Sequence, residues 1–86
     1  MKFKKVVIKA YYDLGEEFIS FPDNPLHGKS YENVTVKFKK AIRTICGISF
    51  DVDIVEISGQ KPIECQLIGR RSIDDTLIIE ICQDWG

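Results

Sequence analysis

The sequence has little of what catalytic and metal sites usually need. It contains one histidine, His27, and three cysteines, Cys46, Cys65 and Cys82. These four residues lie seventeen or more positions apart, whereas zinc sites usually take paired ligands about two to four residues apart. We therefore expect no metal and no other cofactor, with Cys65 and Cys82 acting as small core residues. Catalysis by a Ser–His or Cys–His pair would have to use His27, which has no nucleophile close to it in sequence.

Long apolar runs are also absent. The apolar stretch near the start, Val6–Ile8, is interrupted by Lys9, well short of the roughly 7–15 residues of a signal-peptide core. No stretch approaches the ~20 apolar residues of a membrane span. An odd number of cysteines without a leader is typical of free thiols in a reducing compartment. The sequence therefore predicts a cytoplasmic protein without membrane contact.

Strong net charge is the third absence. The 86 residues carry 12 basic and 13 acidic side chains, for a net charge of −1, so the chain as a whole has no electrostatic attraction to nucleic acid or membrane. What is present is apolar material, since 44% of the residues are hydrophobic. That proportion is sufficient for one compact core, and we expect a single domain over residues 1–86.

Alternating apolar and polar residues predict strands in most of the chain. A turn at residues 13–16 joins the first two strands into a hairpin, and a loop rich in proline follows over residues 21–29. Residues 59–62 and 69–72 are predicted connections. The last strand is nearly continuous in apolar residues, which is typical of a central strand buried on both faces. The predicted strands are Phe3–Tyr12, Glu17–Phe21, Ile48–Ile54, Ile63–Ile68 and Thr76–Cys82.

The segment over residues 31–46 carries two periodicities. At the helical period its apolar residues form one stripe, and Ser30 and Gly47 stand where an N-cap and a C′ residue would. Its many β-branched residues and its period-two alternation favour a strand instead. We predict a helix, and hence an α+β fold of order ββαβββ, with one helix on an antiparallel sheet of about five strands; the alternative is an all-β sandwich or barrel. The helical stripe comprises Tyr31, Val34, Phe38, Ala41, Ile42 and Ile45.

Two short motifs resemble catalytic or nucleotide sites in part. Gly28-Lys29-Ser30 matches the end of a P-loop, but the position five residues earlier, where a P-loop needs glycine, is Asp23. A polar loop followed by the N-cap of the predicted helix explains the motif better. Asp51 and Asp53 share one face of a predicted strand and could hold Mg²⁺, as in a small metal-dependent nuclease. The solvent-facing side of an amphipathic strand has the same appearance, and we prefer that interpretation.

Basic and aromatic residues give the candidate binding positions. Basic residues gather on the polar side of the predicted helix and in one predicted connection, where they would suit a phosphate backbone or an acidic protein surface. Tyr11 and Trp85 lie near element ends, and Tyr, Trp and Arg dominate interface hot spots. Trp85 could instead fold back onto the sheet edge. The basic candidates are Lys37, Lys40, Arg43, Arg70 and Arg71.

These observations favour a small non-enzymatic module that acts by protein–protein contact. It would be an inhibitor, an adaptor or an oligomer-forming factor, of the general kind that phage and mobile elements encode. The partner is expected to be another protein or a second copy of the chain. A nucleic-acid-binding module using the basic helix face is the alternative, and the nuclease with Asp51 and Asp53 is the second alternative.

Overall fold

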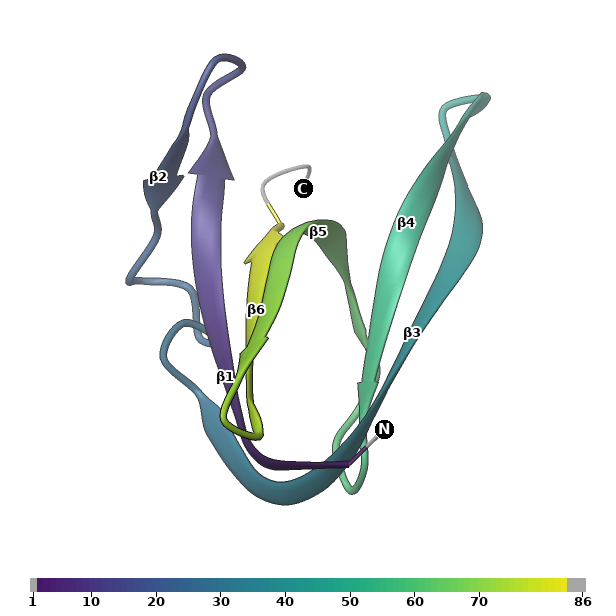
Figure 1. The fold of residues 1–86 in the computed structure, drawn as a ribbon. Coiled ribbons are helices and arrows are strands. Elements are labelled where there is room, and N and C mark those ends of the chain that lie inside the picture. The colour runs from purple at the N-terminus through teal and green to yellow at the C-terminus, as the bar shows by residue number, and fades with distance from the viewer. Residues whose placement is uncertain (1, 84–86) are drawn as a thin grey trace.

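The computed structural model describes residues 2–83 and is all-β over that range (Figure 1). The strands form one six-stranded arrangement in the order β2-β1-β3-β4-β5-β6, and β6 also pairs with β1 in parallel. Five strands therefore close into a barrel, and the short β2 adds to the outside of β1. The six strands are β1 (Lys2–Asp13), β2 (Phe18–Ser20), β3 (Ser30–Ile45), β4 (Ile48–Ile57), β5 (Ile63–Ile73) and β6 (Thr76–Cys82).

The barrel closes because two long strands, β3 and β5, each change partner partway along their length. β3 pairs with β1 through residues 30–35 and with β4 through residues 36–45. β5 pairs with β4 through Ile63–Cys65 and with β6 from Gln66 onward. A register shift between Leu67 and Gly69 marks a bulge in β5, a feature that bends a strand and increases its twist. Figure 1 shows the resulting U, with the β1–β2 hairpin on one side and the β3–β4 hairpin on the other.

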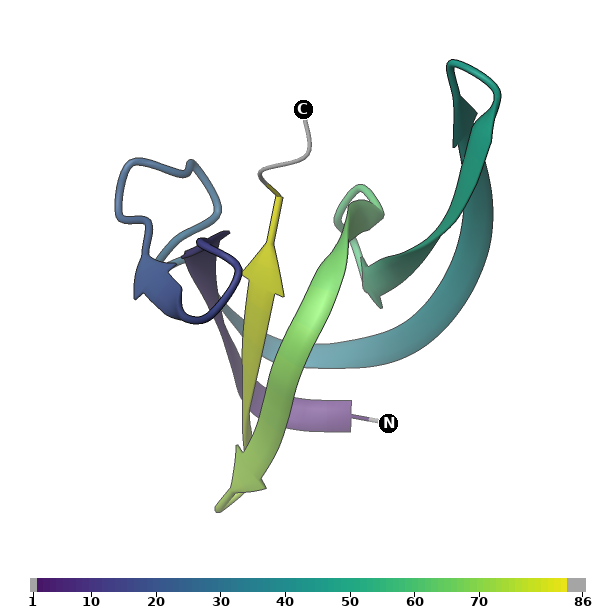
Figure 2. The ribbon, with the colours of Figure 1, turned by 90° about the horizontal axis from the view of Figure 1, so that it is seen from above.

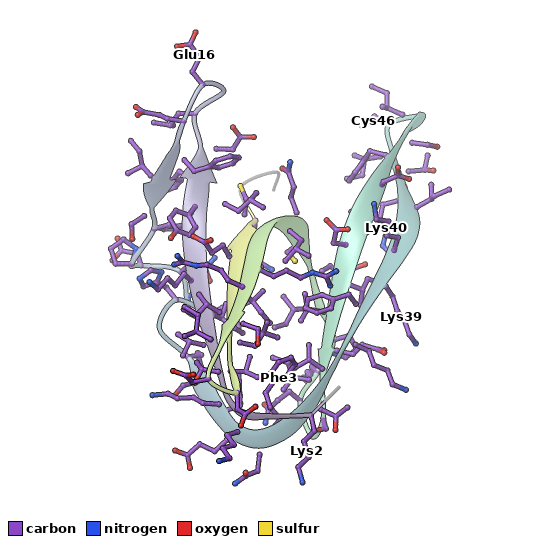
Figure 3. The ribbon with its side chains drawn as sticks, in the orientation of Figure 1. Lys2, Phe3, Glu16, Lys39, Lys40 and Cys46 are labelled. Carbon is purple, nitrogen blue, oxygen red and sulfur yellow. The ribbon has the colours of Figure 1, made fainter. Side chains whose placement is uncertain are left out.

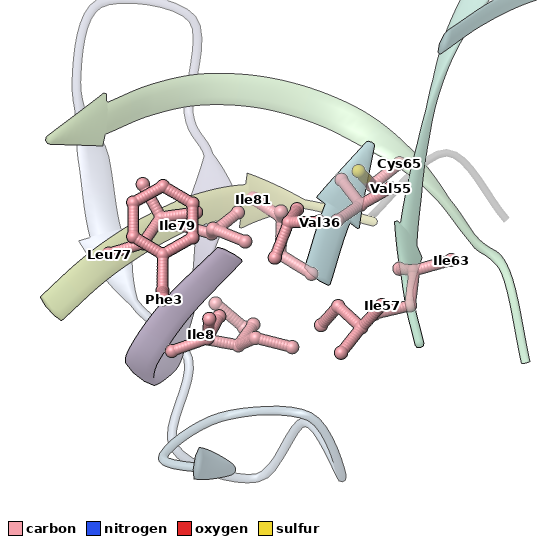
Figure 4. Close-up of a cluster of buried hydrophobic side chains, with 12 residues drawn as sticks. Phe3, Ile8, Val36, Val55, Ile57, Ile63, Cys65, Leu77, Ile79 and Ile81 are labelled. Carbon is pink, nitrogen blue, oxygen red and sulfur yellow. The ribbon is translucent and has the colours of Figure 1, made fainter. Parts of the chain in front are cut away.

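Alternate residues of every barrel strand point inward and form the hydrophobic core (Figure 4). Val6, Ile8, Val55, Ile79 and Cys65 are fully buried. Fully burying an aliphatic side chain of this size stabilises the folded state by about 1.5–3 kcal/mol relative to leaving it exposed. The core is completed by Phe3, Ala10, Val36, Ile57, Ile63, Leu77 and Ile81.

The predicted helix is wrong, and with it the α+β fold; the alternative all-β barrel is the fold observed. Residues 30–45 form the longest strand, β3, and pair antiparallel with β4 from Val36↔Ile57 to Ile45↔Ile48. Cys46 and Gly47 both have positive φ, 51° and 77°, the backbone of a two-residue type I′ hairpin turn. Gly47 is thus a turn residue and no helix C′. The β-branched residues prevail because this turn supplies β4 as a neighbour for them.

The other predicted elements are confirmed, with one correction. The first hairpin, β4, the start of β5 and β6 occur where alternation places them, and β6 is central, between β1 and β5. The predicted connection over residues 69–72 is wrong, because β5 continues to Ile73. The chain turns instead at Asp74 and Asp75, whose φ values are 49° and 63°. Aspartate tolerates this left-handed conformation better than most residues, so a pair of aspartates can replace the usual Asn-Gly.

The β3–β4 hairpin extends well beyond the barrel (Figure 2). β5 pairs with β4 only at residues 53–55, so the ladder from Ala41↔Val52 to Ile45↔Ile48 is a two-stranded ribbon. We call residues 41–52 the arm. The described chain is correspondingly elongated, with principal extents of 41 × 25 × 19 Å. Isolated two-stranded ribbons are marginally stable in water, so the arm depends on its attachment to the barrel.

Candidate functional site

Two of the predicted basic residues meet at one cleft where the arm leaves the barrel. Lys40 and Arg70 line a cleft of about 340 Å³ together with Phe38, Asp53 and Leu67. The guanidinium carbon of Arg70 lies 4.4 Å from the centre of the Phe38 ring, within cation–π range. The side chain of Asp53 is engaged by the backbone, since Leu67 N–H donates to its Oδ2 at 2.9 Å. Lys40 lies directly across from Asp53 in the β3–β4 pairing, so the cleft places basic, aromatic and acidic side chains next to one another.

The remaining basic candidates lie elsewhere. Lys37 and Arg43 are on the opposite face of β3 from Lys40, because side chains alternate along a strand. Arg43 is also paired with Glu64 of β5. Arg71 lines a neighbouring cleft beside Phe3. The basic helix face is thus a wrong prediction: with residues 31–45 forming a strand, the structure brings Lys40 and Arg70 together and separates Lys37 and Arg43 from them.

Tyr11 is engaged within the sheet. A hydrogen bond to Glu80 is the main cause that raises the pKa of the phenol; burial and the negative charge of Glu80 add to it, and Arg71 acts in the opposite direction. Tyr11 is partly buried and its hydroxyl has a partner, so it is a poor candidate for a free hot-spot anchor. Trp85, the other aromatic candidate, lies outside the described residues.

The residues considered for catalysis or metal binding are scattered. His27 Nδ1 accepts a hydrogen bond from Ala10 N–H at 3.0 Å, which ties the proline-containing loop to β1. Cys46 is exposed at the arm's turn, whereas Cys65 and Cys82 are buried. Within residues 2–83, no three His, Cys, Asp or Glu side chains gather closely enough to hold a metal ion. Asp51 and Asp53 do share a face of β4, and that face is the one that Val55 and Ile57 bury in the barrel.

The arm carries the most unusual surface of the described chain. Ile42, Ile45 and Ile48 are 68%, 54% and 70% exposed, although isoleucine is among the residues most often buried. Figure 3 shows Cys46 at the arm's end and Lys39 and Lys40 nearer its base. The helical interpretation placed Ile42 and Ile45 in the core, so it missed this apolar end. The signal that could have revealed it is Ile-Cys-Gly-Ile at positions 45–48, two β-branched residues that flank a two-residue turn with glycine second.

An ion pair across the base of the arm stabilises its position. Arg43 of β3 and Glu64 of β5 are both hydrogen-bonded and ion-paired. Val52 lies on β4, which runs between β3 and β5, and its side chain is on the same face of the sheet as those of Arg43 and Glu64. The pair therefore spans Val52, which explains why this residue is only 4% exposed and yet is no part of the barrel core. Among the described residues, no third strand pairs with the arm between Val52 and its turn.

The two edges of the arm differ in charge. Within residues 2–83, no strand pairs with the outer edge of β3 over residues 37–45, and this stretch carries Lys37, Lys39, Lys40 and Arg43. Lysines on a free edge are a common protection against pairing with another chain. The free edge of β4, Ile48–Val52, reads Ile-Ser-Phe-Asp-Val and has one charge, Asp51. β4 therefore presents the less protected edge.

A second set of exposed apolar residues lies on the β1–β2 hairpin. Leu14, Phe18 and Ile19 are 58%, 46% and 45% exposed. The hairpin is partly supported by Tyr12, whose ring stacks on Phe21 with centroids 4.0 Å apart. Its turn is acidic, with Glu16 at the tip (Figure 3) and Asp13 Oδ1 accepting the Gly15 N–H. Its second strand, β2, has only three residues (Phe18–Ser20), so it offers a shorter free edge than the arm.

Within residues 2–83 there is no helix long and apolar enough to cross a membrane. In the comparison with known proteins, no family model, no curated protein and no solved structure matches this chain.

Proposed function

We propose that this chain is a non-enzymatic protein-binding module that makes contact through its arm. The observation that carries the proposal is the exposure of three isoleucines on the arm: Ile45 and Ile48 lie directly opposite each other on one face, and Ile42 lies on the other face. Each buried methylene group contributes about 0.8 kcal/mol when it leaves water. A partner that contacts both faces of the arm and covers these three side chains would gain that free energy of burial.

The backbone of the arm supports the same function. Its strands expose unpaired amide and carbonyl groups along both edges, because β1 and β5 contact β3 and β4 only nearer the barrel. An exposed sheet edge can accept a strand from a partner, with the backbone providing affinity and the alternate side chains providing selectivity. The arm thus combines apolar anchors with a pairing edge, and the barrel holds both in place.

The test is a capture experiment with two matched variants. The immobilised protein is incubated with a lysate of its native host, and captured proteins are quantified by mass spectrometry. Ile45→Thr and Ile73→Thr form the matched pair, because both residues are 54% exposed and each precedes a two-residue turn with positive φ. We expect the triple variant Ile42→Thr/Ile45→Thr/Ile48→Thr to lose its partners and Ile45→Thr to bind them about tenfold more weakly.

Ile73→Thr should bind as the original protein does. Equal capture by the triple variant and by the original protein would contradict the assignment of the contact to the arm. Circular dichroism of each variant checks that the barrel is folded, since these side chains are outside the core.

A second candidate function is binding of single-stranded nucleic acid at the cleft of Lys40, Phe38 and Arg70. A ring beside cationic side chains is the usual arrangement for stacking a base near its phosphate. It ranks second because Lys37 and Arg43 lie on the opposite face and Asp53 lines the same cleft. Fluorescence anisotropy with labelled single strands tests it. Binding that weakens steeply with salt and is lost in Arg70→Ala would support it.

A further inference from the structure

We infer that the partner of the arm is a second copy of this chain, paired antiparallel through the free edge of β4 about a two-fold axis. This inference rests on the proposed function, since it names the occupant of the same arm. The pairing strand is Ile48–Val52, which β3 covers on one side only. The result is a four-stranded sheet in the order β3-β4-β4-β3, shared between two copies.

The choice of β4 over β3 follows from charge. Antiparallel pairing of two β3 edges would bring together two strands that each carry Lys37, Lys39, Lys40 and Arg43. Like charges directly opposite one another destabilise a strand pair. The β4 edge has only Asp51. Two-fold pairing through β4 also leaves the lysine-rich β3 edges on the outside, where they prevent further growth of the sheet.

Alternation restricts the register to a few possibilities. A two-fold axis perpendicular to the sheet keeps each residue on its own face, so residues directly opposite must be an even number of positions apart. Centring the axis on Asp51 would oppose Asp51 to itself. An axis through Ser49 would pair only Ile48–Phe50 and the residues of the turn. Centring it on Phe50 pairs the whole free edge.

The register centred on Phe50 is self-complementary. It places Phe50 beside its symmetry copy, Ile48 opposite Val52, and Ser49 opposite Asp51, whose carboxylate can accept the serine hydroxyl. No like charges face each other across the interface. Ile48, Phe50 and Val52 all lie on the face that also carries Ile45 and Arg43, so the two arms would place their apolar β4 residues in one row, with Arg43 on the neighbouring β3 of each copy.

A cleft beside β4 accommodates the end of the second arm. Where β5 separates from β4, a cleft of about 470 Å³ is lined by Lys40, Phe50, Asp51, Val52, Asp53, Gln66 and Leu67. In the Phe50-centred register the partner's Ile48 lies against Val52. The next position of β4, Asp53, is paired with Cys65 of β5, so the partner's turn has to bend away from β5 there, toward this cleft. The contact is smaller than a standard interface of about 1,600 Å², and we expect dissociation constants in the micromolar range.

Sedimentation velocity from about 1 µM to about 1 mM tests the pairing and its register. The original protein should pass from monomer to dimer. Ser49→Asp puts a carboxylate opposite Asp51 twice in each dimer and should weaken association about tenfold. Ser49→Lys should strengthen it by a similar factor, and Ser49→Asp/Asp51→Lys should restore it. The matched control is Thr44→Asp, because Thr44 lies directly across from Ser49 on β3 and its side chain contacts the Ser49 hydroxyl at 2.9 Å. Thr44→Asp should leave the dissociation constant of the dimer nearly unchanged.

Cross-linking provides a second, independent readout. In a Cys46→Ser background, Phe50→Cys brings the two introduced thiols together at the axis, within the roughly 4.4–6.8 Å Cα separation that a disulfide allows. Ile48→Cys places its thiols about 13 Å apart along the strands and serves as the control. Oxidation should give a covalent dimer only from the first variant. Equal cross-linking of both, or a monomer throughout the concentration range, would overturn the inference.

The two proposals can fail separately. A chain that stays monomeric but captures a different protein through Ile42, Ile45 and Ile48 would overturn the second-copy inference and leave the proposed function standing. A chain that neither associates with itself nor loses a partner when the arm is altered would contradict both.

Discussion

β3 and β4 belong both to the barrel and to the arm, and the same two strands have opposite surroundings in the two regions. In the barrel, Val36, Val55 and Ile57 are 4% exposed or less, because β1, β5 and β6 cover them. In the arm, Ile42 and Ile48 are 68% and 70% exposed. Local sequence is equally strand-like in both. Burial therefore depends on whether a second layer is present, which alternation within one strand does not encode.

The largest expected contrast between the two regions is thiol reactivity. Cys46 at the arm's turn is exposed, and Cys65 in the barrel is 0% exposed. We expect a thiol reagent such as 5,5′-dithiobis(2-nitrobenzoate) to modify Cys46 more than about 10³ times faster than Cys65, since Cys65 requires the barrel to open. Mass spectrometry of digested protein assigns the sites. Comparable rates would mean that the barrel opens as readily as the arm.

Burial of Cys65 also predicts a dependence of stability on pH. Desolvation, followed by the charges of Asp53 and Cys82, raises the pKa of the Cys65 thiol from 9.0 to about 12. The folded state therefore retains the proton more tightly than the unfolded state. This contribution is fully present below about pH 9 and is lost as pH rises toward about 12. Urea unfolding at pH 8 and pH 10 should show that the free energy of unfolding is lower at pH 10. The difference should be smaller in Cys65→Ala, which has no thiol at this position.

Truncation of isoleucine should separate the regions next. Ile79→Ala removes a fully buried side chain from the barrel core, and we expect it to lower the free energy of unfolding by about 2–5 kcal/mol. Ile42→Ala in the arm should change it by less than about 0.5 kcal/mol. Urea denaturation measures both. A large loss in Ile42→Ala would show that the arm has a core role that its exposure does not suggest.

Two glycines allow a closer comparison of the turns. Gly59 joins β4 to β5 in the barrel, and Gly47 lies in the arm's turn; their φ values are 80° and 77°, and a Cβ at either position would meet open space. Alanine at such a φ costs about 1–2 kcal/mol. We expect Gly59→Ala to lower global stability by that amount and Gly47→Ala by less than half of it, because the arm opens before the barrel. Equal losses would indicate that arm and barrel unfold as one unit.

The smallest expected effect concerns the ion pair that spans Val52. Arg43→Ala should lower the global free energy of unfolding by less than about 1 kcal/mol, since the pair is about half exposed. It should nevertheless speed hydrogen exchange at Val52, whose cover it removes. Lys39→Ala is the control, because Lys39 pairs with Glu56 at 3.1 Å on the same face, nearer the barrel. Faster exchange in both variants to the same extent would argue against a specific role for Arg43.

The sequence allowed most of the strands to be predicted, because alternation is a local property. The nearly continuous apolar run of β6 correctly predicted that it has a strand on each side, but only one of its faces is fully buried, because Thr76, Ile78 and Glu80 are half-buried. The error at residues 31–46 had a physical cause: Val34, Phe38 and Ile42 satisfy the helical period and the strand alternation together. What decided the outcome was a long-range partner, β4, attached through a Cys-Gly turn that lacks the usual Asn-Gly signal.

The candidate site was predictable only in part. The sequence drew attention to Lys40 and Arg70, and the structure brings them to one cleft. Lys37 and Arg43 lie on the opposite face from Lys40 because residues 30–45 form a strand and not a helix. The Ile-Cys-Gly-Ile turn could have revealed the hairpin, but the exposure of its isoleucines was not evident, since an apolar residue in a strand normally signals a core and the sequence does not show where the neighbouring strands end.

Amide hydrogen exchange at two protein concentrations tests the central claim, that the free edge of β4 in the arm pairs with a second copy while the barrel supports it. We predict that amides of residues 48–52 exchange more slowly at about 1 mM than at about 10 µM, because the second copy covers that edge. Amides of β1 and β6 should exchange at the same rate at both concentrations. Residues 48–52 that exchange equally fast at both, or slowing confined to the barrel strands, would contradict the account.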